Sequence, residues 1–185
     1  MKRLLCVAML CVTCGSVARA DVLSGSKTIS LSNDQGERVA IGRVVFTPEA
    51  DGRTRFSITL DDRLEEFFLA MRPFRCLTGA AQRLCNFPVV REAPLVSERD
   101  LVPLEYALMF MRTAPAALHI NPFNGVYYRM KVVDGRIEGA VHDVDMEPFI
   151  VPDSVPLERR TRPLRDADLN PGDPRSHWMP RLTIE

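Results

Sequence analysis

The Asp134-Gly135 dipeptide is the feature that most restricts how this chain can fold. It separates two segments in which apolar and polar residues alternate, residues 126–133 and 136–142. A two-residue Asp-Gly loop favours a tight hairpin turn, because both central positions of that turn need positive φ angles. The pattern therefore predicts an antiparallel β-hairpin whose register begins with Val133 facing Arg136.

This register gives the hairpin one apolar and one polar face. The predicted apolar pairs are Val132 with Ile137, Met130 with Gly139, and Tyr128 with Val141. The predicted polar pairs are Lys131 with Glu138, Arg129 with Ala140, and Tyr127 with His142. Opposite charges directly across the ladder are favourable, and a slip of one residue would turn every side chain to the wrong face. We predict that the apolar face is buried and the polar face is wet.

More strands are predicted before the hairpin. The segments KTISLS, RVAIGRVVF and RFSITLD alternate, and turn signals separate them at residues 33–36 and 49–52. A period of two between such turns is typical of an antiparallel meander. The segment LEEFFLAMRPF fits a helical spacing and an edge strand about equally well, and we interpret it as strand.

The segment RDLVPLEYALMFMRT, residues 99–113, is the best helix candidate. Ser97 or Asp100 could cap it, and Pro103 would lie in the first turn, where a missing N–H costs little. Leu104, Leu108 and Met111 would then share one face. The run is apolar all round, so for residues 101–112 a buried strand remains the alternative.

The chain from Pro148 onward loses this regularity. Seven of the fourteen prolines fall there. We expect an extended segment packed over the sheet, with RLTIE as a possible last strand. The predicted anchors are Phe149, Ile150, Leu164, Leu169 and Trp178.

The N-terminus predicts export. Residues 1–20 combine a basic start, an apolar stretch too short to span a membrane, and the ending Ala18-Arg19-Ala20. We expect a cleavable signal peptide and a periplasmic protein. The alternatives are a secreted protein or one anchored through a lipid on Cys14.

Loss of the signal peptide would leave two cysteines, Cys76 and Cys85. In an oxidising compartment two such cysteines most simply form a disulfide. A loop of this length would stabilise the fold by roughly 2–3 kcal/mol on the loop-entropy model. A redox centre usually needs a Cys-x-x-Cys pair or a setting that favours the thiolate, and the sequence shows neither.

The expected architecture is one mature domain, with a β-rich part at residues 21–147 and a Pro-rich C-terminal extension, residues 148–185, packed on it. The fold class is mainly β: an antiparallel, strongly curved sheet or small barrel with one short α-helix and one disulfide. Whether such a sheet encloses a cavity is left open by the sequence.

No residue pattern indicates catalysis. The chain has no Gly-x-Ser-x-Gly elbow. On a strand Asp143 and Asp145 point away from His142, so no metal site is predicted, and no cofactor is predicted either. The mature chain would carry 21 basic and 24 acidic residues, which argues against a nucleic-acid partner.

We therefore predict a periplasmic, non-catalytic binding protein, whose partner is a small apolar ligand or a cell-envelope protein. The candidate binding residues are Tyr127, Tyr128, Arg129, His142 and Trp178. The alternative is a hydrolase acting on envelope material, with carboxylates or His142 and His177 assembled by the fold.

Several segments together resemble a family of short exported proteobacterial proteins without an assigned function. These segments are FFLAMRPFRC, INPFNGVYYR, IEGAVHDVD and DPRSHWMPRLTIE. The likeness covers most of the chain from Phe67 onward. It implies a Gram-negative periplasmic setting and no catalytic residue. A looser likeness, over about 25 residues of the hairpin, is to lipocalin-like secreted domains.

Overall fold

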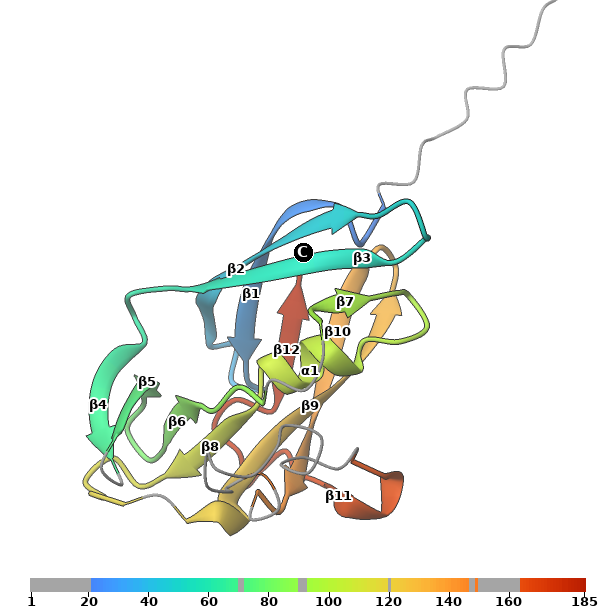
Figure 1. Ribbon diagram of the computed structural model, residues 1–185. Coiled ribbons are helices and arrows are strands. Elements are labelled where there is room, and N and C mark those ends of the chain that lie inside the picture. The colour runs from blue at the N-terminus through green and yellow to red at the C-terminus, as the bar shows by residue number, and fades with distance from the viewer. Residues whose placement is uncertain (1–20, 70–71, 90–92, 120, 147–148, 150–163) are drawn as a thin grey trace, which may run out of the picture.

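The computed structural model describes residues 21–69, 72–89, 93–119, 121–146, 149 and 164–185 (Figure 1). The predicted signal peptide and the predicted anchor Ile150 lie outside the described residues. Within that part of the chain, no helix is long and apolar enough to cross a membrane.

The described residues form one antiparallel sheet of twelve strands, with one short α-helix. The first seven strands are β1 (Gly25–Ser32), β2 (Arg38–Pro48), β3 (Thr54–Leu60), β4 (Glu65–Leu69), β5 (Arg72–Thr78), β6 (Arg83–Asn86) and β7 (Leu95–Val96). The helix is α1 (Val102–Ala107). The later strands are β8 (Phe110–Thr113), β9 (Gly125–Val133), β10 (Arg136–Val144), β11 (Leu169–Pro171) and β12 (Arg181–Ile184). Two 3₁₀ turns, η1 (Pro122–Asn124) and η3 (Asp166–Asp168), lie between strands.

The strands follow the spatial order β4-β5-β6-β8-β9-β10-β12-β1-β2-β3-β7, with β11 paired to β10. Within the described residues this path is open and is neither closed nor strongly curled. The prediction of a strongly curved sheet or small barrel is therefore wrong. The meander of β1, β2 and β3 and the strand interpretation of β4 and β5 are confirmed.

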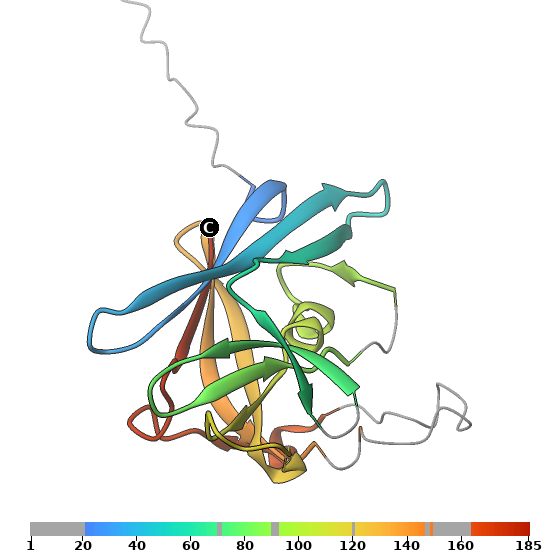
Figure 2. The ribbon, with the colours of Figure 1, turned by 90° about the vertical axis from the view of Figure 1, so that its left-hand side faces the viewer.

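The helix α1 lies where the ladder between β8 and β9 ends. The strand β8 pairs with β9 only at Val126 and Gly125. Beyond that point α1 contacts β9 on one side and β7 on the other (Figure 2). The backbone N–H of Met130 donates to the carboxylate of Glu105 at 2.5 Å instead of to another strand. A side chain of α1 thus satisfies a sheet edge that would otherwise need a strand.

The predicted hairpin is confirmed residue by residue. The strands β9 and β10 pair with Val133 opposite Arg136, and every following pair is as predicted. The turn residues Asp134 and Gly135 have φ angles of 48° and 79°. One part of the prediction fails: Tyr127 is buried, because a second cluster of side chains covers that end of the polar face.

Residues 101–112 combine both alternatives. The helix ends early, and the chain continues as β8, paired with β6. The side-chain amide of Asn86 donates to the carbonyls of Ala107 and Met109, which ties down the backbone where the helix stops. The predicted face is therefore wrong, since Leu104 and Leu108 enter one core cluster and Met111 the other. Pro103 lies in the first turn as expected.

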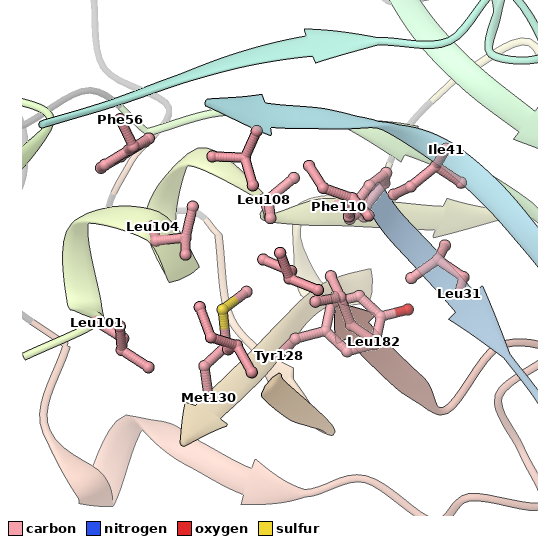
Figure 3. Close-up of a cluster of buried hydrophobic side chains, with 14 of the residues drawn as sticks. Leu31, Ile41, Phe56, Leu101, Leu104, Leu108, Phe110, Tyr128, Met130 and Leu182 are labelled. Carbon is pink, nitrogen blue, oxygen red and sulfur yellow. The ribbon is translucent and has the colours of Figure 1, made fainter. Parts of the chain in front are cut away.

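Two clusters of buried side chains hold the sheet, one on each face. The main core receives side chains from nearly every strand and from α1, and Figure 3 shows Leu104, Leu108, Phe110 and Tyr128 converging there. Gly139 lies where Tyr128 and Leu182 approach, and a Cβ on it would meet Tyr128 Cβ at 3.0 Å. The second core lies on the opposite face and contains the Cys76–Cys85 disulfide, which joins directly paired residues of β5 and β6.

The last strand occupies a central place. The first four residues of RLTIE form β12, which lies between β10 and β1 and pairs with both. The C-terminal segment thus completes the sheet.

Candidate functional site

The five predicted binding residues do not gather at one place. Tyr128 is fully buried in the main core, where its hydroxyl donates to the carbonyl of Met179 at 2.7 Å. Burial raises the pKa of this phenol above its usual range. His142 is half-exposed on β10, with Nδ1 3.1 Å from the carbonyl of Ala140. These two residues point to opposite sides of the sheet.

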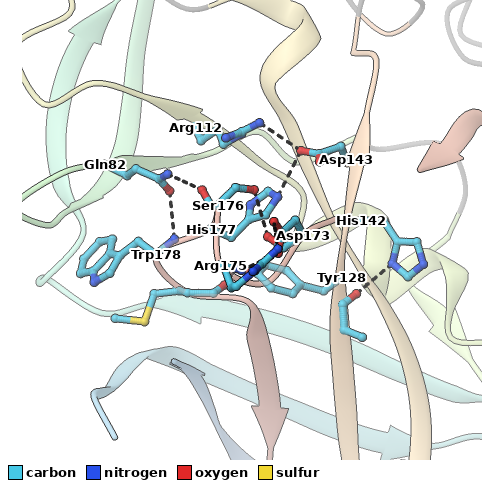
Figure 4. Close-up of polar contacts among 12 residues, drawn as sticks. Gln82, Arg112, Tyr128, His142, Asp143, Asp173, Arg175, Ser176, His177 and Trp178 are labelled. Carbon is cyan, nitrogen blue, oxygen red and sulfur yellow. Dashed lines mark hydrogen bonds and ion pairs between the residues drawn. The ribbon is translucent and has the colours of Figure 1, made fainter. Parts of the chain in front are cut away.

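Trp178 joins the C-terminal segment to two distant turns. Its backbone N–H donates to the side chain of Gln82 at 3.0 Å (Figure 4). Its indole N–H donates to Glu37 at 2.8 Å. The ring lies so close to Gly79 that a Cβ there would overlap it at 2.6 Å. These contacts fix the segment that leads into β12.

Tyr127 and Arg129 both line a small cleft of about 220 Å³ beside α1. The hydroxyl of Tyr127 donates to the carboxylate of Glu105, which is itself 4% exposed. Burial raises the pKa of Glu105, although hydrogen bonds from Tyr127 and Met130 oppose this effect. Burial also raises the pKa of Tyr127. Both oxygens of Glu105 already accept hydrogen bonds, so this carboxyl supports the sheet edge.

A polar cluster closes one end of the main core. The imidazole of His177 is buried, and its Nε2 lies 3.2 Å from Asp143 of β10 (Figure 4). Arg112 of β8 approaches the same carboxylate oxygen at 3.3 Å. Burial lowers the pKa of His177, and the nearby Asp143 only partly offsets this. His142 immediately precedes Asp143 on β10 and therefore points to the opposite face. The fold thus gives His177 an acidic neighbour but does not bring the two histidines together.

A further surface site is a row of arginines, of which the sequence singled out only Arg129. We call the face of β9, β10, β12, β1 and β2 that points away from the main core the outward face. Along one line across it the register places Arg129, Ala140, Arg181, Ser32 and Arg38, one residue from each strand. We call Arg129, Arg181 and Arg38 the arginine row. The small residues Ala140 and Ser32 stand between these arginines, so the surface between neighbouring arginine side chains is recessed.

A concave site of about 480 Å³ surrounds this row, and we call it the arginine groove. It is also lined by Lys131, Arg136, Glu138, Thr183 and Glu185. Among the described residues that line the groove, five are cationic and two are acidic. This excess of positive charge is local, because the whole chain has a formal net charge of zero.

The arginines of the row are held by carboxylates at the rim. Arg38 pairs with Glu185, Arg181 with Asp34, and Arg129 with Asp166 at 3.0 Å. All three arginine side chains are about half-exposed, so these pairs are worth only about 0–1 kcal/mol each. Such pairs orient the guanidinium groups and can be exchanged for other anions at little cost.

Sequence reasoning found only one end of this site. The hairpin register alone places Arg129 beside Ala140 and two residues from Lys131 on the polar face. The other two arginines join them because β12 inserts between β10 and β1. That pairing is long-range and has no local signal.

Among the described residues no group of three or more histidine, cysteine, aspartate or glutamate side chains is placed to hold a metal ion. Comparison with known proteins gives no match to a protein-family model, to a curated protein or to a solved structure. The likeness to exported proteobacterial proteins and to lipocalin-like domains therefore stays a prediction.

Proposed function

We propose that this chain is an exported, non-catalytic binding protein and that it holds an anionic partner in the arginine groove. The observation that carries the proposal is the arginine row, in which three guanidinium groups stand on alternate strands of a rigid sheet. Arginine presents a planar fork of donors that matches carboxylate and phosphate groups. A site built on paired strands holds such forks in fixed positions.

The groove supports a polar partner better than an apolar one. Its volume is within the range of about 300–1,000 Å³ that ligand sites occupy, but charged side chains dominate its lining. The main core is filled by its own side chains, among them Phe110, Leu104 and Tyr128, each with no exposed surface. Of the two predicted partners, a cell-envelope protein with acidic groups fits the groove, and a small apolar molecule does not.

The buried pair of His177 and Asp143 gives less support to a hydrolase. A general acid or base must reach the substrate proton directly or through one water. The side chain of His177 is only 1% exposed, and Arg112 already neutralises Asp143. These contacts favour a role in closing the core.

The test is an NMR titration of the exported protein with dextran sulfate, a polyanion without a defined charge spacing. We expect amide shifts to concentrate on the five residues of the cross-strand line. Replacing Arg38, Arg129 and Arg181 together by serine should weaken binding about tenfold or more, equivalent to at least about 1.4 kcal/mol.

The matched control replaces Arg53, Arg63 and Arg175 by serine. These three exposed arginines pair with neighbouring aspartates and lie outside the groove. The control removes the same total charge and should change binding less than about threefold, or about 0.7 kcal/mol. Equal losses in the two triple variants, or shifts that avoid the groove, would show that the site is not the arginine groove.

A further inference from the structure

We infer that the partner is an acidic protein segment that lies across the strands along the arginine row, with carboxylates about three residues apart. This inference rests on the proposed function and specifies its ligand. It follows from the spacing of the row, from the groups that now occupy it and from the chemistry that the groove lacks.

The spacing is set by the sheet. Neighbouring strands lie about 4.7–4.9 Å apart, so arginines on alternate strands have backbones roughly 9.5 Å apart. Arg129, Arg181 and Arg38 stand on β9, β12 and β2. The strand β10 separates the first two of these strands, and β1 separates the last two. The row therefore spans about 19 Å at right angles to the strands. Ala140 and Ser32 leave room along this line for a chain to lie between the guanidinium groups.

The occupants of the row show which anion it accepts. Each of its three arginines is paired with a carboxylate from elsewhere in the chain: Glu185, Asp34 or Asp166. Asp34 lies in the turn between β1 and β2, and Asp166 lies in η3. The side chains of these three acids are 45%, 57% and 84% exposed, so they sit at the rim and can turn away. An incoming carboxylate would form the same paired contact that each rim acid now makes.

An extended peptide reproduces the spacing of the row. In a polyproline II helix the rise is about 3.1 Å per residue, and every third side chain points the same way, which gives a repeat of about 9.3 Å. In a β-strand the side chains on one face repeat at about 6.6–6.8 Å, which does not match. A segment with an acid at every third position would therefore place one carboxylate at each arginine.

The lining of the groove disfavours other polyanions. None of the described residues that line it is aromatic. Sugar rings and nucleic-acid bases commonly stack on aromatic side chains. Proteins that lie on membranes insert apolar side chains such as Trp, Phe or Leu beside their basic residues. Among the described residues that line the groove, the only large apolar one is Leu182, whose side chain is buried in the main core. Charge and backbone spacing are what the site offers, and an acidic peptide uses both.

The experiment compares three synthetic peptides that each carry four glutamates. The glutamates are separated by one, two or three prolines, which places them at every second, third or fourth position. Proline after each glutamate favours the extended conformation in all three. Binding to the exported protein is measured by calorimetry at low salt. We expect the third-position peptide to bind about tenfold more tightly than the other two, a difference of about 1.4 kcal/mol.

Two variants test whether the guanidinium group of Arg181 is responsible for the spacing preference. Arg181→Lys keeps the charge at the centre of the row but loses the planar fork. It should reduce the preference for the third-position peptide to less than about threefold, or 0.7 kcal/mol. Arg175→Lys makes the same change outside the groove and should leave the preference intact. If Arg181→Lys changes nothing, the row does not read carboxylate spacing.

The remaining outcomes separate this inference from the proposed function. Equal binding of all three peptides, with dextran sulfate still bound at the groove, would overturn the inference alone. Tighter binding of tetragalacturonate, which carries four carboxylates on sugar rings, or of vesicles containing phosphatidylglycerol would replace the peptide by another polyanion. If dextran sulfate does not bind at the groove either, the proposed function fails as well.

Discussion

The two faces of the same central strands differ in what fills the space between neighbouring side chains. On the side of the main core, Leu31, Leu182, Gly139 and Tyr128 come from neighbouring strands and lie close against one another. On the outward face the next line of residues alternates long arginines with Ala140 and Ser32, which leaves a groove. The alternation of a β-strand thus produces a stable core and an open polar site from adjacent residues.

This difference predicts that substitutions one residue apart will separate stability from binding. A side chain on the core face contributes through burial and close packing. A side chain on the outward face contributes little to folding, since its ion pairs are exposed. The predictions that follow move from the core face to the outward face.

The largest effect is expected at Leu182, which has no exposed surface and lies between Gly139 and Leu31. Leu182→Ala should lower the free energy of unfolding by about 3–5 kcal/mol, because it removes buried methyl groups and leaves a cavity in a central strand. Urea denaturation measures the loss. A decrease below about 1 kcal/mol would show that the core beside β12 collapses around the cavity or was never tightly packed.

The second-largest effect is expected at Glu105 of α1, whose carboxylate contacts the edge of β9. Glu105→Ala should cost about 2–3 kcal/mol, because it leaves the N–H of Met130 and the hydroxyl of Tyr127 without partners. Glu98→Ala, at an exposed position just before α1, should change stability by less than about 0.5 kcal/mol. Equal effects of the two substitutions in urea denaturation would mean that the carboxylate does not hold the edge of β9.

The sequence predicted the core face well, because its pattern is local. The turn at Asp134-Gly135 fixes the hairpin register, and the register fixes which side chains are buried. Tyr127 was predicted to be exposed but is buried, because side chains of α1 and of the second core pack over it. The alternation of residues along a strand carries no information about such distant contacts. The end of α1 was missed for a related reason: the run through Leu108 and Met111 is apolar all round, so its periodicity could not separate helix from strand.

The outward face could be predicted only in part. Arg129 was identified, since its position depends on the hairpin alone. Arg181 and Arg38 reach the same line because β12 pairs with both β10 and β1. This pairing places Arg181 beside Ala140 and Ser32, which lie about 40 and about 150 residues away in the chain. Sheet closure was likewise undetermined, because it depends on whether β4 and β7, the two end strands of the path, pair with each other.

A smaller effect is expected at His177, at the end of the core. Because burial lowers its pKa in the folded state, the unfolded chain binds more protons as the pH falls. This contribution to stability should be complete above the unfolded pKa of about 6.5 and should be lost progressively below it. Urea denaturation between pH 7.5 and 5.5 measures this loss. His177→Gln should flatten the curve in this window. A curve that stays unchanged in His177→Gln would assign the pH dependence to other groups.

The smallest effect on stability is expected at Arg181, the neighbour of Leu182 on the opposite face. Arg181→Ser removes an exposed side chain and its pair with Asp34, so the free energy of unfolding should change by less than about 0.5 kcal/mol. The same substitution removes the central fork of the arginine row and should weaken anion binding and its dependence on salt. Arg63→Ser, which breaks an exposed pair with Asp61 outside the groove, provides the control for both measurements. If Arg181→Ser destabilises the protein as much as a core substitution does, the outward face is part of the folding core, and its arginines serve the sheet. If it alters only binding, then of the adjacent residues of β12 Leu182 serves stability and Arg181 serves binding. The strand that completes the core then also carries the centre of the proposed site.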